Sequence, residues 1–515
     1  MLTPADLSLP EKFGSWRPGQ LQTAAKIAAS EKYAFLLDAP TGSGKSLIAA
    51  AVQRLVGKNM VYCCTTKQLQ DQLLHDFPYA RTLKGRNNYP CLKYEKMYPR
   101  ISAEDCTHSR EQECRFHNRC PYVRAKREAL AAPLAILNIA YFLSEANFVG
   151  GFSDCELLVI DECDTLEDQL MSFTQLVITQ RQLSSLDISP PRYKTKFESW
   201  VEWARRALDS LIPQLRGLEG EIDNSSWGTV DFALLRKKRN LTRLVSKLKF
   251  FTAEVDKTWV WYPGADKWVF KPVWIAKYAS GVLWKHAKRV LEMSATVLDA
   301  KQMCVNTGLL YGDRKFDYIA LPSPFAKEHR PVYYEPCGSI IRKRMDIALP
   351  QLALALKKIM DKHPNDRILV HTVSYKVRDY LRMNIKSDRF IIHSTADRDK
   401  VLENFKRSVK PLVLLSPSMG RGVDLPDEEC RVVVIAKVPY PDLGDPQVNR
   451  RVHGSKDGDD WYAHKTVSTI VQASGRACRS MDDYSITYVL DGQFGKIYGE
   501  HFKVFPAWYR ESVIM

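Results

Sequence analysis

The chain has 515 residues, of which 45% are hydrophobic and 26% are charged; this is typical of globular protein and long enough for roughly two to four domains. Its 75 lysines and arginines outnumber 59 acids, and the net charge of +16 fits either a polyanionic partner or a solvated basic surface. The longest apolar stretch, LAAPLAILNIAYFL from residue 130, is too short for a bilayer, and the N-terminus lacks a secretion-signal pattern. We therefore expect a cytoplasmic, reducing location without a membrane partner, where the twelve cysteines are thiols or metal ligands.

The first motif in the chain is DAPTGSGKSLIAA at residues 38–50, which follows the apolar run YAFLL. A glycine-rich turn before a helix lets backbone N–H groups surround phosphate oxygens, and the helix dipole favours the anion. The pattern predicts a nucleotide-phosphate loop in which Gly42 and Gly44 supply conformational freedom and Lys45 reaches the β and γ phosphates. The hydroxyl of Ser46, or more loosely that of Thr41, is expected to face Mg²⁺.

Short apolar runs rich in β-forming residues recur along the chain with helical patterns between them, which is typical of a parallel sheet covered on both faces. Two separate sets predict two α/β lobes. The first set lies at 33–37, 60–66, 134–138 and 156–161, and the second at 367–373, 389–393, 412–418, 430–440 and 485–491.

Four cysteines with the spacing C-x14-C-x7-C-x5-C lie between the first and third runs of the first lobe: Cys91, Cys106, Cys114 and Cys120. Four thiolates in a short segment suit either tetrahedral zinc or a cubane iron–sulfur cluster, and spacing alone does not separate these. His108 and His117 add options compatible with zinc, and unliganded thiols are the third reading.

The segment that contains these cysteines is strongly basic. Residues 81–127 carry twelve lysines and arginines against five acids, with Tyr89, Tyr94, Phe116 and other aromatic residues between them. Such a surface fits contact with phosphates and stacking on bases, although a plain basic surface is the alternative.

An acidic motif, DEC-D at 161–164, follows the apolar run ELLVID. In this position Asp161 is expected to hold Mg²⁺ through water, and Glu162 to orient or deprotonate the attacking water. The alternative is an acidic helix N-cap without a catalytic role.

Residues 171–282 differ in pattern from both lobes and predict a mostly helical insertion. Within it, residues 238–278 alternate basic and aromatic side chains. The sequence favours equally a packed core, helical or hairpin, and a nucleic-acid contact for these aromatic residues.

The second lobe contains SPSMGRGVDLP at 416–426 and QASGRACR at 472–479, after SATVLDA at 294–300. Two arginines on one helical face, Arg476 and Arg479, could reach across a cleft to a γ-phosphate and stabilise its developing charge. In this order the motifs have the layout of a superfamily 2 helicase motor.

The set APTGSGKS, DECD, MSAT, GVDLP and QASGRACRS, with VPYPDLGDPQVNRR at 438–451, resembles the XPD/DinG family of iron–sulfur DNA helicases over nearly the whole chain. The resemblance implies ATP and Mg²⁺ as cofactors and a [4Fe–4S] cluster on the four cysteines. By matched position it also implies that Gln20 reads adenine, that Asp161 and Glu162 act in hydrolysis, and that the second lobe completes the ATP site. The residues implied in the second lobe are Asp424, Gln472, Arg476 and Arg479.

The resemblance also implies a domain organisation: an α/β fold with two RecA-like P-loop motor domains, an inserted iron–sulfur domain and an arch-like, mostly helical insertion in the first. The expected divisions are 1–84, 130–170 and 283–325 for the first motor domain with its crossover, 85–129 for the cluster domain, 171–282 for the arch and 326–515 for the second motor domain.

The function expected from this resemblance is unwinding of forked duplex DNA by 5′ to 3′ movement on single-stranded DNA, by a DNA-associated protein that can work as a monomer and uses its cluster domain as a wedge. A translocase that remodels nucleoprotein with little unwinding is the alternative, and a non-motor ATPase switch is a third reading. Asp164, where the family commonly has His, and Arg421, where it commonly has an acid, are departures expected to affect coupling.

Overall fold

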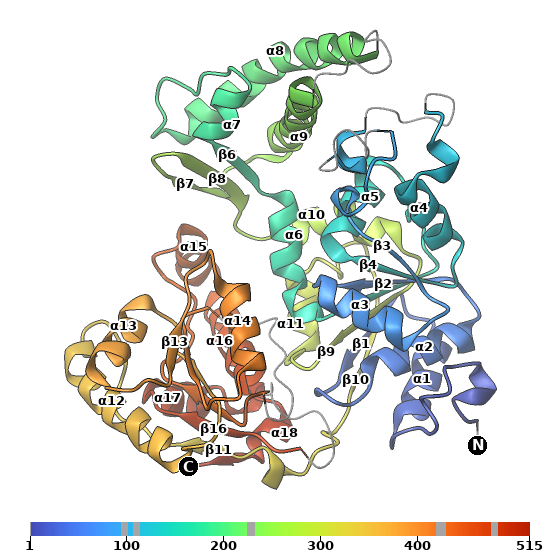
Figure 1. Cartoon of the computed structure of the whole chain (residues 1–515). Helices are drawn as coiled ribbons and strands as arrows, with labels where there is room; N and C mark the ends of the chain where they lie inside the picture. The colour runs from blue at the N-terminus through green and yellow to red at the C-terminus, as the bar shows by residue number, and fades with distance from the viewer. Residues whose placement is uncertain (1, 94–100, 107–113, 224–231, 419–428, 475–482) are drawn as a thin grey trace.

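The computed structural model describes residues 2–93, 101–106, 114–223, 232–418, 429–474 and 483–515. These residues form two α/β lobes, and an insertion of helices and a small sheet extends from the first lobe (Figure 1). The prediction of two α/β domains is thereby confirmed.

The first lobe is built on a sheet whose strands are all parallel. Its central strands are buried on both faces, which explains their continuous apolar sequences. In spatial order the strands are β10 (Phe316–Ala320), β1 (Ala34–Asp38), β9 (Val290–Ser294), β5 (Leu157–Asp161), β2 (Met60–Cys64), β4 (Leu134–Asn138) and β3 (Arg81–Leu83).

Helices cover both faces of this sheet (Figure 1). They are α1 (Gln20–Ala29), α2 (Lys45–Val56), α3 (Lys67–Asp76), α4 (Pro121–Ala131), α5 (Ile139–Phe148), α6 (Leu166–Thr174), α10 (Ala276–Val282) and α11 (Ala300–Asn306). Because the strands are parallel, the residues that follow β1, β5 and β9 meet at one edge of the sheet, where ligands bind in open α/β folds.

The second lobe repeats this architecture with another all-parallel sheet. Its strands, in spatial order, are β13 (Phe390–Ile392), β14 (Val413–Ser416), β12 (Ile368–His371), β15 (Val432–Ile435), β16 (Ile486–Val489), β11 (Val332–Tyr334) and β17 (Val513–Ile514). Its helices are α12 (Met345–Lys362), α13 (Tyr375–Asn384), α14 (Arg398–Arg407), α15 (Pro446–Gly454), α16 (Gly458–Ser474), α17 (Gln493–Glu500) and α18 (Ala507–Arg510).

The insertion combines two long helices with an antiparallel sheet that the helical pattern did not predict. Its elements are β6 (Leu176–Thr179), α7 (Gln180–Ser185), α8 (Phe197–Asp223), α9 (Phe232–Glu254), β7 (Trp259–Pro263) and β8 (Lys267–Pro272). Trp259, Trp268 and Phe270 from the sheet are buried with Trp200 and Phe251 from the helices. These aromatic side chains therefore form a core.

Among the described residues, none of the helices combines the length and the apolar character that crossing a membrane requires.

Candidate functional site

The glycine-rich segment predicted to be the phosphate loop connects β1 to α2. Gly42 and Gly44 have φ angles of 80° and 78°, which only glycine adopts without strain. A Cβ on Gly44 would lie 2.3 Å from Nε2 of Gln20, so a side chain here would also displace the Gln20 amide. Lys45 is the first residue of α2, and its Nζ donates a hydrogen bond of 3.1 Å to the carbonyl of Ala39. The loop, the lysine and the helix N-terminus thus have the arrangement that phosphate binding requires.

The acidic motif lies beside this loop at the end of β5. Asp161 accepts a 2.7 Å hydrogen bond at Oδ2 from the hydroxyl of Tyr62, and its Oδ1 accepts one of 2.9 Å from the backbone N–H of Glu162. The Tyr62 hydroxyl lies 3.5 Å from Oγ of Ser46, so one tyrosine joins the two predicted Mg²⁺ ligands. The hydroxyl of Thr65 donates to the Glu162 carboxylate.

Oxygen ligands suit Mg²⁺, and Ser46 and Asp161 supply them on facing elements. Burial and the nearby Asp161 carboxylate raise the pKa of Tyr62 well above its ordinary value, so its hydroxyl is protonated and donates. The chemistry of this donor set fits the metal that the family uses.

The second lobe reaches this site through Gln472. Its Nε2 donates hydrogen bonds of 2.9 Å to Oγ1 of Thr296 and 3.3 Å to Oδ2 of Asp164. Asp164 also accepts a 2.7 Å hydrogen bond from Oγ of Ser294. The departure at Asp164 therefore lies in a hydrogen-bonded link between DECD, SAT and the second lobe.

Gln20 lines the site, but both ends of its side-chain amide are hydrogen-bonded to the protein backbone. Its Oε1 accepts a 2.8 Å hydrogen bond from the backbone N–H of Arg17, and its Nε2 donates one of 2.8 Å to the carbonyl of Ser43. Arg17 in turn donates to the carbonyl of Gly42. Gln20 thus fixes the phosphate loop to the segment before α1, and adenine recognition by its side chain stays a prediction.

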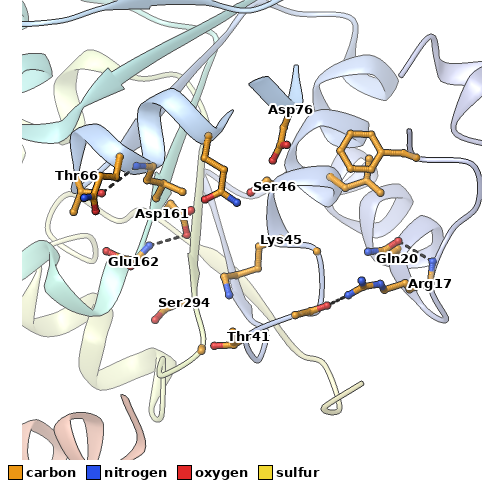
Figure 2. Close-up of a pocket in the computed structure, with 18 of the residues that line it drawn as sticks. Arg17, Gln20, Thr41, Lys45, Ser46, Thr66, Asp76, Asp161, Glu162 and Ser294 are labelled. Carbon is orange, nitrogen blue, oxygen red and sulfur yellow. Dashed lines mark hydrogen bonds between the residues drawn. The ribbon is translucent and has the colours of Figure 1, made fainter. Parts of the chain in front are cut away.

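These residues surround a cleft of about 1020 Å³ between the two lobes. Figure 2 shows Lys45, Ser46, Asp161 and Glu162 around the same space, with Thr41 on the phosphate loop below them. Gln472 and Trp508 line the cleft from the second lobe. Arg476, Arg479 and Asp424 lie outside the described residues, as does Arg421.

Two carboxyl groups are buried in the sheet next to the cleft. Burial raises the pKa of Asp38, at the end of β1, to about 6, although the hydroxyl of Tyr318 donates a 3.3 Å hydrogen bond to it. Burial also raises the pKa of Glu292 in β9 to about 8. Neither oxygen of Glu292 has a hydrogen-bond partner among the described residues. Near pH 7 Glu292 therefore favours the neutral form, whereas Asp38 stays mostly ionised.

The four cysteines of the predicted cluster all lie in one small part of the first lobe and are half-buried. Cys91 and Cys106 flank an antiparallel bridge between Pro90 and Ser102, while Cys114 and Cys120 flank the 3-10 turn that leads into α4. The rings of Tyr89 and Tyr122 join these two pieces at 5.7 Å.

Within the described ranges, no group of three or more His, Cys, Asp or Glu side chains is close enough to hold a metal ion. Four thiols in one compact segment fit the chemistry of either zinc or a cubane cluster, so the ligand set stays a prediction.

Sequence reasoning missed Tyr62, Thr65 and Arg17. Tyr62 lies in the run MVYCC, where it is indistinguishable from a core aromatic residue until β2 and β5 are known to be neighbours. The hydrophobic pattern predicts that both strands exist and gives no information about their pairing.

The comparisons with known proteins agree with this site. Residues 17–196 match the DEAD/DEAH box helicase family, and residues 356–512 match the helicase C-terminal domain. The ATP-dependent DNA helicase YoaA of Haemophilus influenzae is 22% identical over an alignment of 615 positions, gaps included, which covers 96% of this chain and 94% of the relative. The relative of the same name from Escherichia coli is 20% identical, with 92% and 90% covered.

Two solved structures share the fold. An XPD helicase has a TM-score of 0.67 at 18% identity, over 95% of this chain and 98% of that one. Xpd4 of S. tokodaii has a TM-score of 0.59 at 16% identity, over 96% and 99%. With both helicase domains in order along one chain, this protein is an XPD/DinG-like member of the superfamily 2 helicases.

Proposed function

We propose that the chain is an ATP-dependent DNA helicase that moves 5′ to 3′ on single-stranded DNA and unwinds forked duplex. The observation that carries this proposal is the interlobe cleft, in which Lys45 and Asp161 from the first lobe face Gln472 from the second. A site shared by two lobes changes their relative position when its nucleotide changes, which is what a motor requires. DNA as the substrate is supported by the relatives, which are named ATP-dependent DNA helicases.

The residues of the cleft divide the chemistry between them. Lys45 and the N-terminus of α2 hold the β and γ phosphates, and Glu162, oriented by Thr65, aligns the attacking water and accepts its proton. Ser46 and Asp161 would hold Mg²⁺, which offsets charge on the phosphate oxygens when it is bound. Arg476 and Arg479 would complete the site as cross-cleft cations, Asp424 would line it, and Gln20 would recognise the base.

The cysteine segment is proposed to hold a [4Fe–4S] cluster on Cys91, Cys106, Cys114 and Cys120. The cluster would have a structural role, because it would tie the two pieces that Tyr89 and Tyr122 bring together. A segment stiffened in this way could act as the wedge that parts duplex strands. The resemblance supports iron over zinc.

Unwinding of a forked DNA duplex by anaerobically purified protein tests this function. The substrates carry a labelled strand and either a 5′ or a 3′ single-stranded tail, with ATP and Mg²⁺ present. We expect displacement only from the 5′-tailed fork. Displacement only from the 3′-tailed fork would overturn the polarity.

Lys45→Ala is the matched negative control, and it should fold normally while losing ATP turnover because the phosphates lose their cation. Full turnover in this variant would remove the phosphate-loop assignment. ATPase stimulated by single strands but without displacement from either fork would instead identify a translocase that remodels nucleoprotein.

A further inference from the structure

Helix α16 runs along the boundary between the lobes and contacts the first lobe near both of its ends. Near its C-terminal end, Gln472 donates to Thr296 in the cleft. Near its N-terminal end, Nε1 of Trp461 donates a 3.1 Å hydrogen bond to Oε2 of Glu167 on α6. Eleven residues at 1.5 Å each place these contacts about 16 Å apart on one rigid element.

The contact at Trp461 is centred on a buried ion pair. Arg451 on α15 lies 2.6 Å from Glu167, and the two residues are only 3% and 5% exposed. The guanidinium of Arg451 packs against the rings of Trp274 and Trp461, 4.5 Å from each centroid, and these two rings meet edge to face. Lys465 adds a second cation 3.6 Å from Glu167.

Helix α15, with its N-cap residue Asp445, also contacts the root of the insertion. Nε of Arg451 donates a 2.6 Å hydrogen bond to the carbonyl of Val273, directly after β8. Gln447 donates one of 2.7 Å to the carbonyl of Pro272, and Tyr262 on β7 donates one of 2.5 Å to Asp445. The insertion belongs to the first lobe in sequence, yet its hairpin is docked on the second lobe.

This cluster joins three parts of the molecule. Glu167 lies on the helix that follows the DECD motif, Arg451 belongs to the second lobe, and Trp274 lies at the end of the insertion. Burying an ion pair costs desolvation that its attraction barely offsets, so the pair contributes little stability beyond that of apolar packing. The pair instead favours one defined arrangement of the three parts, because any arrangement that separates the two residues leaves a buried charge without a partner.

We propose that Arg451 and Glu167 are positioning residues that couple the nucleotide cleft to the insertion. When ATP draws Gln472 and the second lobe toward the first, α16 and α15 move as one unit and shift the β7–β8 hairpin through Arg451. By linkage, a nucleic-acid strand that displaces the hairpin changes ATP affinity by the same factor. This coupling rests on the ATP-binding function proposed above and adds to it the route by which the insertion senses nucleotide.

Hydrogen exchange of the full chain, with and without a non-hydrolysable ATP analogue and Mg²⁺, tests the coupling. Two segments are followed: the phosphate loop and α2 at 39–56, and the hairpin at 259–272. In the wild-type protein we expect both segments to change on nucleotide binding, the hairpin by about fivefold or more in exchange rate, the low end of typical coupling.

The test variant is Arg451→Met combined with Glu167→Gln. It removes both charges together and keeps an acceptor for Trp461, while Lys465 keeps Asp168 at 3.0 Å. Arg382→Gln, an exposed change on α13 of the second lobe, is the control for loss of a surface cation. We expect the double variant to keep the phosphate-loop response and lose the hairpin response, while the control keeps both.

A hairpin that responds equally in the double variant would overturn the coupling. The coupling would also be overturned if, in the wild-type protein, nucleotide changed exchange in the phosphate loop but not in the hairpin. If exchange in the wild-type phosphate loop does not change when nucleotide is added, the proposed ATP binding is wrong, and the coupling that rests on it is wrong as well.

Discussion

A single hydroxyl, that of Tyr62, connects the two residues expected to hold Mg²⁺. Tyr62 is almost fully buried and donates to Asp161 while lying against Ser46. A hydrogen bond to a charged group contributes about 1.5–3 kcal/mol. Tyr62 therefore orients the carboxylate before the metal arrives.

The change Tyr62→Phe is expected to raise the Mg²⁺ concentration at the midpoint of nucleotide binding by about tenfold, because Asp161 loses the donor that orients it. Binding of a fluorescent ATP analogue during Mg²⁺ titration measures this. Nucleotide affinity without Mg²⁺ should stay unchanged. Tyr79→Phe, at a half-buried tyrosine outside the cleft, is the control; an unchanged Mg²⁺ midpoint in Tyr62→Phe would exclude the orienting role.

Glu292 makes stability depend on pH. Its pKa rises from the ordinary 4.5 to about 8 on burial, so between these values the folded chain binds more protons than the unfolded chain. The contribution of Glu292 to the free energy of unfolding is therefore greatest below pH 4.5. It decreases as the pH rises to 8, by up to about 1.4 kcal/mol per pH unit.

We expect Glu292→Gln to reduce this loss, so that its melting temperature exceeds that of the wild type at pH 8 more than at pH 5. Thermal unfolding at several pH values provides the measurement, with the exposed Glu202→Gln as control. Parallel pH curves for wild type and Glu292→Gln would show that the buried carboxyl does not titrate in this range.

At the scale of elements, α9 of the insertion is tied to the cysteine segment. Arg239 lies 2.7 Å from Asp105 and 3.4 Å from Glu104, and Arg243 also pairs with Glu104. These acids lie directly before Cys106. These ion pairs therefore connect the insertion to the cysteine segment.

Replacing Arg239 by Gln should release this contact. Partly exposed pairs contribute up to about 1 kcal/mol each, so we expect amide exchange in residues 101–106 to speed up by about fivefold. Added salt should reduce the difference between wild type and variant. Arg236→Gln, at an exposed position on the same helix, is the control, and equal exchange in the two variants would show that Arg239 contributes nothing specific.

Across the whole molecule, the cysteine segment lies at one edge of the first sheet and the ATP cleft lies mainly over other strands. β3 and β4, next to the cysteine segment, lie at one edge, whereas β1, β9 and β5 carry the cleft residues. Loss of a cluster should thus spare nucleotide binding.

Cys106→Ser is expected to lower the iron content of anaerobically purified protein and to impair unwinding, while ATP-analogue affinity stays within about twofold of wild type. Iron analysis and the binding titration give the two readings. Cys337→Ser in the second lobe is the matched control. Unchanged iron in Cys106→Ser would remove this residue from the ligand set.

The sequence predicted the elements better than their contacts. Strands such as β5 and β12 are recognisable because burial on both faces demands continuous apolar runs, and Gly44 because its conformation admits no other residue. For the residues of hairpin β7–β8, a helical and a hairpin core both stayed open, since their aromatic residues fit a helical pattern as well as an alternating one. Arg451 ends the motif VPYPDLGDPQVNRR, but its contacts were not predicted, because only the docked lobes bring Trp274 and Trp461 against it.

The position of β9 has a consequence for biosynthesis. It pairs with β1 on one side and β5 on the other, yet the whole insertion separates it from β5 in the chain. At about 5–20 residues per second, the ribosome needs roughly 6 to 26 seconds to pass from the end of β5 to the start of β9. During that time the nascent chain holds β1 and β5 with their facing edges unpaired, which makes this interval the point at which chaperone binding would matter most.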